Sequence, residues 1–239
     1  MPRYRNNLCT FYCCLVDHYG FHQRDVQVVY NNNGNYDFGW RTSPVGTKVA
    51  TSQAAQTAIT TALAGLTDDD LFVLYTTNHG TATGRLNLWG GGEYLDLITL
   101  DTLLAANKQP YCFGVFGHCF SRDMADQFVA SAGQGKGVAV SASNSSSTAL
   151  PPDDMYDAFV YHFTTALQRQ TPSGHPVLLD PNDPDDDSDV TVKQAFEFTD
   201  NLQSYKELRK RGGLMKDHPF LSQDKSGNLA ASLTLRGRK

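Results

Sequence analysis

Two residues that could share a proton follow two apolar runs of this sequence. His79 is the second residue after the run 71–77 (LFVLYTT), and Cys119 is the second residue after the run 111–117 (YCFGVFG). A cysteine becomes a strong nucleophile when a nearby base favours its thiolate, and the same base can later protonate a leaving amine. Gly80 has no side chain, so its N–H can approach a substrate carbonyl and, with the Cys119 N–H, hold an oxyanion. These residue types predict nucleophilic acyl-transfer chemistry.

The chain must supply elements that bring this pair together. Short apolar runs bounded by Gly, Asn, Asp or Pro predict buried strands, and segments of helical pattern alternate with them. Such alternation indicates an α/β fold with a mostly parallel sheet and helices on both faces. The expected strands are 26–30, 71–77, 111–117 and 137–143; the expected helices are 4–19, 51–66, 97–107, 121–132, 154–168 and 191–211.

The predicted topology places the pair at one edge of that sheet. Helix 97–107 connects strands 71–77 and 111–117, so a right-handed crossover makes these strands neighbours. Neighbouring strands lie about 4.8 Å apart, and chemistry in open parallel sheets collects beyond their carboxyl ends. We therefore expect His79 and Cys119 to meet there. His118, next to Cys119, should point to the opposite face and pack elsewhere.

Longer segments around the pair resemble the legumain family of cysteine peptidases. LFVLYTTNHG followed by GRLNLW and then YCFGVFGHCFS is similar to the family's two strands that end in the catalytic histidine and cysteine. YRNNLCTFYCCLVDHYGFHQRDVQVVYNN, GVAVSASNSSSTA and PPDDMYDAFVYHF extend the likeness over residues 4–165. The resemblance implies a caspase-like three-layer sandwich and a cysteine endopeptidase that acts on peptides or proteins through a thioester. It implies no required metal or organic cofactor. The alternative is a catalytically inactive scaffold or recognition module of the same fold.

The same resemblance implies residues for substrate binding. Arg5 and Asp154 match the family's arginine and acid that bind an asparagine side chain, so cleavage is expected after Asn or Asp. Ser141 and Ser143 fall on the strand that lines the family's substrate groove.

Three departures from the family pattern affect these expectations. The family's Glu two residues before the cysteine is Gly117 here, and its histidine-orienting Asn falls near Arg3, which leaves no third catalytic member identifiable. The family's first strand is also missing ahead of helix 4–19. The run 230–236, a strand from a second copy, or direct pairing of 26–30 with 71–77 could fill the gap. Direct pairing is favoured because it needs no long return of the chain.

An acidic run near the end of the chain matches part of a calcium-binding loop. Its acids and one threonine fall at positions 1, 3, 5, 7 and 9 of the loop pattern: Asp183, Asp185, Asp187, Asp189 and Thr191. Ser188 replaces the turn glycine and Gln194 the closing glutamate, so a solvated acidic loop is the favoured alternative.

Composition limits the classes of protein that fit. The 239 residues, 40% of them apolar, suit one domain over 1–239, with a core at about 4–170 and an extension over 171–239. A net charge of −5 without a long basic run argues against nucleic acid as a partner. No run of about 18 apolar residues predicts a membrane span, and the first residues lack a signal-peptide cleavage pattern. Five cysteines argue against a disulfide framework, so an intracellular location is slightly favoured.

Overall fold

A four-stranded sheet forms the middle of the computed structural model, which describes residues 2–31, 44, 47–90, 92–107, 110–143, 156–179, 189–202, 219–223 and 228–238. The strand order is β1-β4-β5-β6. The first three strands run parallel, and the last, an edge strand missed from sequence, runs antiparallel. Their bounds are β1 Leu71–Thr76, β4 Tyr111–Phe116, β5 Gly137–Ser141 and β6 Phe220–Gln223. The prediction of an α/β fold with a mostly parallel sheet is confirmed.

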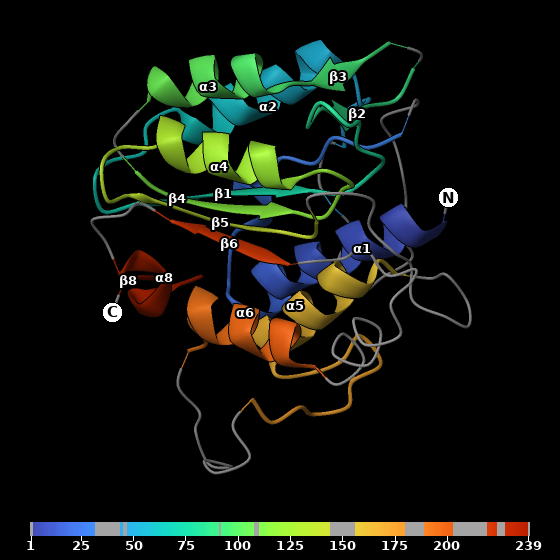
Figure 1. Ribbon diagram of the computed structural model, residues 1–239, viewed down its shortest axis with the longest axis vertical. Helices are drawn as coiled ribbons and strands as arrows, with labels where there is room; N and C mark the ends of the chain where they lie inside the picture. Colours follow the sequence, from blue (N-terminus) through green and yellow to red (C-terminus); the bar gives the residue numbers. More distant parts are fainter. Residues whose placement is uncertain are drawn as a thin grey trace.

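Helices cover both faces of this sheet (Figure 1). One face carries α2 (Ser52–Leu63), α3 (Leu97–Ala105) and α4 (Arg122–Ser131). The other carries α1 (Pro2–Cys13), α5 (Ala158–Gln168) and α6 (Val192–Asn201). Along β4, Phe113 and Val115 pack into the cluster with α5, and Cys112 and Phe116 into the cluster with α3 and α4. This alternation on a strand buried on both faces explains its continuous apolar sequence.

Smaller elements complete the chain. They are the π-helical segment η1 (Cys14–His18), the 3₁₀ segment η2 (Gln23–Asp25), β2 (Leu86–Asn87), β3 (Tyr94–Leu95), α8 (Leu229–Ser232), β7 (Leu233–Thr234) and β8 (Gly237–Arg238). Thr191 and Gln194 form a capping box that starts α6, as their spacing indicates. The described part of the chain has no helix that could cross a membrane.

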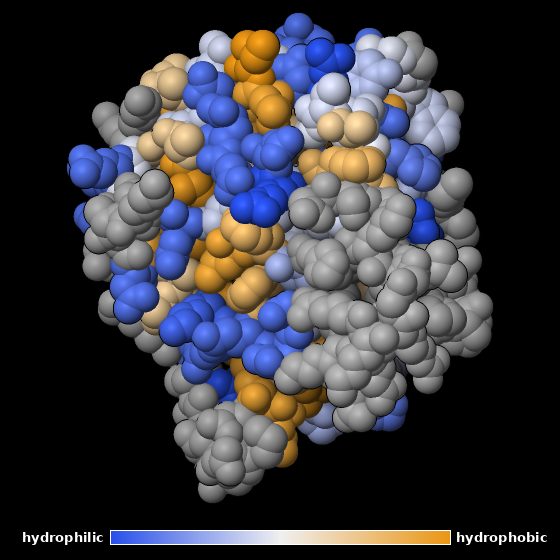
Figure 2. Space-filling view, in the orientation of Figure 1, coloured by the Kyte–Doolittle hydropathy of each residue, from blue (hydrophilic) through white to orange (hydrophobic). Residues whose placement is uncertain are grey.

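Polar and apolar side chains mix on the face shown in Figure 2. Large apolar side chains that are exposed are few among the described residues: Trp89, Ile98 and Leu178. Most of the bulky apolar side chains among these residues therefore lie inside three core clusters.

Two of the three expectations for the missing first strand are wrong in the described part of the structure, while a strand from a second copy stays a prediction. Segment 26–30 does not join the sheet, and the bridge it forms with the described residues is from Val29 to Lys48. The run 230–236 forms the end of α8 and β7, and β7 pairs with β8. Among the described residues no strand pairs with the outer edge of β1, which is therefore an open edge.

Candidate active site

Cys119 lies in the turn between β4 and α4, beyond the carboxyl end of the sheet. The Gly117 N–H donates a 2.8 Å hydrogen bond to the carbonyl oxygen of Thr76, which ties the ends of β4 and β1 together. Phe120 has a left-handed backbone (φ 54°), and Ser121 is the N-cap of α4. A non-glycine residue in that region is uncommon and turns the chain sharply. The half-buried Cys119 side chain therefore sits on a tight turn just before a helix N-terminus.

Gly80 packs directly against this turn. A methyl group built on its Cα would lie 1.9 Å from the Cys119 carbonyl oxygen and 2.7 Å from Nδ1 of His118. Only glycine allows so close an approach. The segment His79–Gly80 and the turn at Cys119 therefore lie against each other, as expected for residues that follow adjacent parallel strands.

The His79 side chain is held by α1. Its Nδ1 lies 3.3 Å from the hydroxyl oxygen of Tyr4, and the two rings meet edge-on with centroids 5.3 Å apart. Burial lowers the pKa of His79 below its ordinary 6.5, and the positive charge of Arg3 lowers it further. The imidazole is thus neutral at pH 7 and able to accept a proton. With Nδ1 on Tyr4, Nε2 is the nitrogen left for that role.

Tyr4 is tied in turn to a buried carboxylate. An Arg3 guanidinium N–H donates to the Tyr4 hydroxyl oxygen over 2.8 Å, and Nε of Arg3 lies 3.2 Å from a carboxylate oxygen of Asp157. The Tyr4 pKa is raised by burial, while Arg3 lowers it and the charge of Cys119 adds to the rise. The Tyr4 hydroxyl therefore contacts both Arg3 and His79.

Asp157 connects three elements. Its other carboxylate oxygen accepts a 2.6 Å hydrogen bond from Asn7, whose amide also donates to the Thr77 hydroxyl just past β1. Burial raises the Asp157 pKa to about 6, although Arg3 and Asn7 both lower it. The N-cap of α5, the first helix and the end of β1 are joined through this carboxylate.

His118 is fully buried, as expected, but it does not pack away from the site. Its Nδ1 lies 2.9 Å from the Cys119 carbonyl oxygen, and burial lowers its pKa to about 4. It contacts the backbone of the turn that carries Cys119. Full burial and this contact with the turn leave the His118 ring without access to solvent.

The predicted substrate residues are placed less favourably. Arg5 is half-buried on α1, where its charge partly offsets the burial that raises the Cys9 pKa to about 12. Ser141 and Ser143 are fully buried, and the Ser143 carbonyl oxygen accepts from the Arg122 N–H. Asp154 lies outside the described residues. Full burial therefore keeps the Ser141 and Ser143 side chains from contact with a substrate in this structure.

The predicted calcium ligands lie mostly outside the described residues. Of the four acids only Asp189 is described, and it pairs with Arg236 at 2.9 Å. Within the described ranges no group of three or more His, Cys, Asp or Glu side chains is arranged to hold a metal. All five cysteines are thiols, in line with the expectation from their odd number.

Sequence reasoning missed the connection from Tyr4 through Arg3 to Asp157. In the structure Arg3 and Asn7 are four residues apart on α1 and so share a face, but Arg3 lies just outside the helix predicted over 4–19. Their common partner is 150 residues further along the chain and could not be found from helix spacing alone. The sequence matches no protein-family model and no curated protein.

Proposed function

We propose that this protein is a cysteine endopeptidase with a caspase-like fold, in which Cys119 is the nucleophile and His79 its general base. The observation that supports this most is the contact of Gly80 with the Cys119 carbonyl, because it joins the two strand ends that carry the pair. The hydrogen bond between His79 Nδ1 and the Tyr4 hydroxyl adds support, since an Nδ1–H that donates to the Tyr4 oxygen leaves Nε2 unprotonated and orients it as the base.

In the proposed reaction, neutral His79 takes the proton of the Cys119 thiol, and the sulfur attacks the substrate carbonyl carbon. The N–H groups of Gly80 and Cys119 stabilise the oxyanion; one such donor typically contributes about 3 kcal/mol to transition-state stabilisation. The amine leaves with the proton from His79, and a thioester remains. Water then attacks the thioester, gives its proton to His79 and releases the acid, which restores the thiol.

Specificity for Asn or Asp before the cut is a second part of the proposal, and it rests on Arg5 and Asp154. A guanidinium and a carboxylate can bind the two ends of a carboxamide. Cleavage profiling on a peptide library tests it. Cleavage mainly after Lys or Arg would rule out this pocket.

Exchange of the nucleophile tests the mechanism. Cys119→Ala should remove cleavage of a fluorogenic peptide library, because no other thiol follows a strand beside His79. Cys13→Ala is the matched control, since Cys13 is also half-buried but lies on α1. If Cys119→Ala cleaves as fast as Cys13→Ala, the mechanism is wrong.

The competing function is a catalytically inactive module of the same fold. The open edge of β1 and the absence of an acid at Gly117 favour it. An electrophilic peptide ketone, followed by mass spectrometry, separates the two functions. An active site should react selectively at Cys119 and more slowly after His79→Ala, whereas an inert thiol should not react faster than Cys13.

A further inference from the structure

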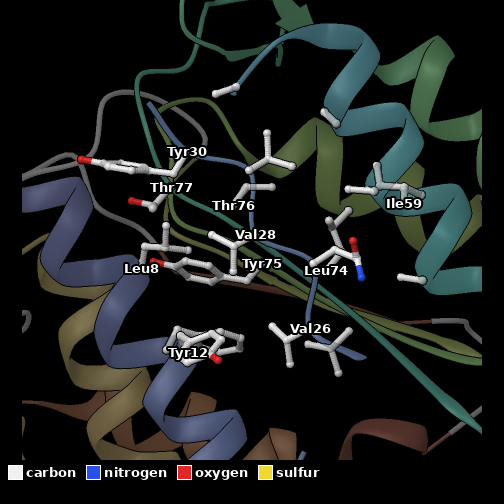
Figure 3. Close-up of a pocket in the computed structure, with 18 of the residues that line it drawn as sticks. Leu8, Tyr12, Val26, Val28, Tyr30, Ile59, Leu74, Tyr75, Thr76 and Thr77 are labelled. Atoms are coloured by element: carbon white, nitrogen blue, oxygen red, sulfur yellow. The ribbon is translucent and has the colours of Figure 1, made fainter. Parts of the chain in front are cut away.

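A cavity of about 310 Å³ lies beside the open edge of β1 (Figure 3). Its walls are β1, the extended segment 26–30, and the helices α1 and α2. Leu8, Phe11 and Tyr12 line it from α1, and Ala58 and Ile59 line it from α2. We call this cavity the edge slot. Its side-chain walls are mostly apolar, so water would gain few hydrogen bonds there.

One wall of the edge slot presents backbone groups that have no strand partner in the described part of the chain. The Tyr111 N–H donates to the Asp70 carbonyl and the Gly117 N–H to the Thr76 carbonyl, so even-numbered residues of this stretch direct their backbone groups at β4. In a strand the intervening residues direct theirs to the other side. The N–H and C=O groups of Val73 and Tyr75 therefore point into the edge slot.

The opposite wall, formed by segment 26–30, also directs backbone groups into the edge slot. The Lys48 N–H donates to the Val28 carbonyl, and the Tyr30 N–H donates to the Lys48 carbonyl, both over 2.9 Å. The backbone groups of Val29, between them, point away from Lys48 and so toward the edge slot. In Figure 3 Tyr30 lies near Thr77 and Val28 near Tyr75, with Val26 toward the other end, so the two walls run in the same direction.

From these two facing rows we infer that the edge slot accepts an extended strand of a partner polypeptide. A strand parallel to β1 would give both rows hydrogen-bond partners, whereas a small apolar ligand would cover the side chains and leave the peptide groups unpaired. The strand must be apolar on both faces, because α1 covers one side of the slot and α2 the other. This inference does not depend on the proposed catalytic function.

Peptide binding tests the inference directly. The probe is a pool of fluorescein-labelled peptides with Val, Ile, Leu or Phe at six central positions between terminal lysines, and binding is measured by fluorescence anisotropy with the full chain. Binders should lose at least about tenfold in affinity when alternate central amides are N-methylated, because several ladder hydrogen bonds are lost. Ala58→Trp, which fills the slot, should weaken binding similarly. Thr57→Trp, an exposed position on the same helix, should leave it unchanged.

Amide hydrogen exchange followed by NMR provides a readout that does not depend on a variant. In the protein alone, the amides of Val73, Tyr75 and Val29 should exchange faster than those of Phe72 and Leu74, which bond to β4. Bound peptide should slow the hydrogen exchange of the Val73, Tyr75 and Val29 amides. Three results would each overturn the inference: equal protection of both sets without peptide, a pool that neither binds nor slows these amides, or N-methylated peptides that bind as tightly as the parents. The last result would indicate a pocket for apolar side chains only.

Discussion

The hydroxyl oxygen of Tyr4 lies 3.3 Å from Nδ1 of His79, and the same oxygen accepts a hydrogen bond from Arg3. The imidazole is therefore fixed by the first helix of the chain, which is itself fixed to α5 through Asp157. A neutral histidine that serves as a base needs one nitrogen held and the other open. In the mechanism we propose, Tyr4 would take the role of orienting the histidine, for which no residue could be identified from the sequence.

Removal of this hydroxyl should affect catalysis more than folding. We expect Tyr4→Phe to lower kcat/KM about fivefold to tenfold, the effect of one lost hydrogen bond of about 1 kcal/mol, and to leave the melting temperature nearly unchanged. The measurement is steady-state cleavage of the best library peptide, alongside thermal unfolding.

Tyr12→Phe is the matched control for this change. Tyr12 also lies on α1, and its buried hydroxyl has no hydrogen-bond partner among the described residues. Equal losses of kcat/KM in the two variants would show that the Tyr4 hydroxyl does not act through His79.

The lowered pKa of His79 sets the acid side of the pH profile. A general base must be unprotonated, so the acid limb of kcat/KM should have its midpoint below pH 6.5. Arg3→Met removes a positive charge that lowers this pKa and should move the limb upward. Arg3→Lys keeps the charge and should move it less. If the acid midpoint of kcat/KM were the same in the parent and in Arg3→Met, the protonation of His79 would not control the rate.

The sequence predicted the part of the site that follows local rules. Buried strands, their order and the positions just past their ends follow from apolar runs and crossover handedness, so His79, Gly80 and Cys119 could be placed at one edge of the sheet. The contacts of Arg3 with Asp157 and of Tyr4 with His79 join residues 154 and 75 positions apart. No periodicity encodes such a contact.

The prediction for 26–30 was wrong because an apolar, β-branched run specifies burial but not a partner. Its residues do line a buried space, yet their backbone bonds to Lys48 and not to the sheet. The edge strand β6 was missed for the opposite reason. FLSQ is short and only partly apolar, and its place in the sheet comes from pairing with β5.

Asp157 should make the stability of the protein fall as pH rises. Its folded-state pKa is raised from 3.8 to about 6, so the folded state favours the protonated acid. The stabilisation is fully present below pH 3.8 and is lost as pH rises through about 6. Two pKa units correspond to about 3 kcal/mol.

Urea unfolding at several pH values checks this with Asp157→Asn, which cannot titrate. Between pH 4 and pH 7 the free energy of unfolding of the parent should fall relative to that of the variant, by up to about 3 kcal/mol. The comparison cancels the opposite effect of His118, whose pKa is lowered. If the free energy of unfolding changed equally with pH in the parent and in Asp157→Asn, then Arg3 and Asn7 would fully compensate the buried charge.

Gly117 should tolerate no side chain, which bears on how substrate is selected. A methyl group built there would lie 2.5 Å from Cγ2 of Val160 on α5 and 3.1 Å from the Thr76 carbonyl oxygen. We expect Gly117→Ala to cost about 1–3 kcal/mol in the free energy of unfolding, since a β-branched side chain in a packed helix cannot move aside easily. A glutamate at this position would be costlier still, so it could not supply substrate contacts without rearrangement of α5.

The double-mutant cycle with Val160→Ala tests the cause, because that change removes the clashing methyl group. Measured by urea unfolding, Gly117→Ala should cost about 1 kcal/mol less in the Val160→Ala background than in the parent. An equal cost in both backgrounds would place the constraint on the backbone at Thr76.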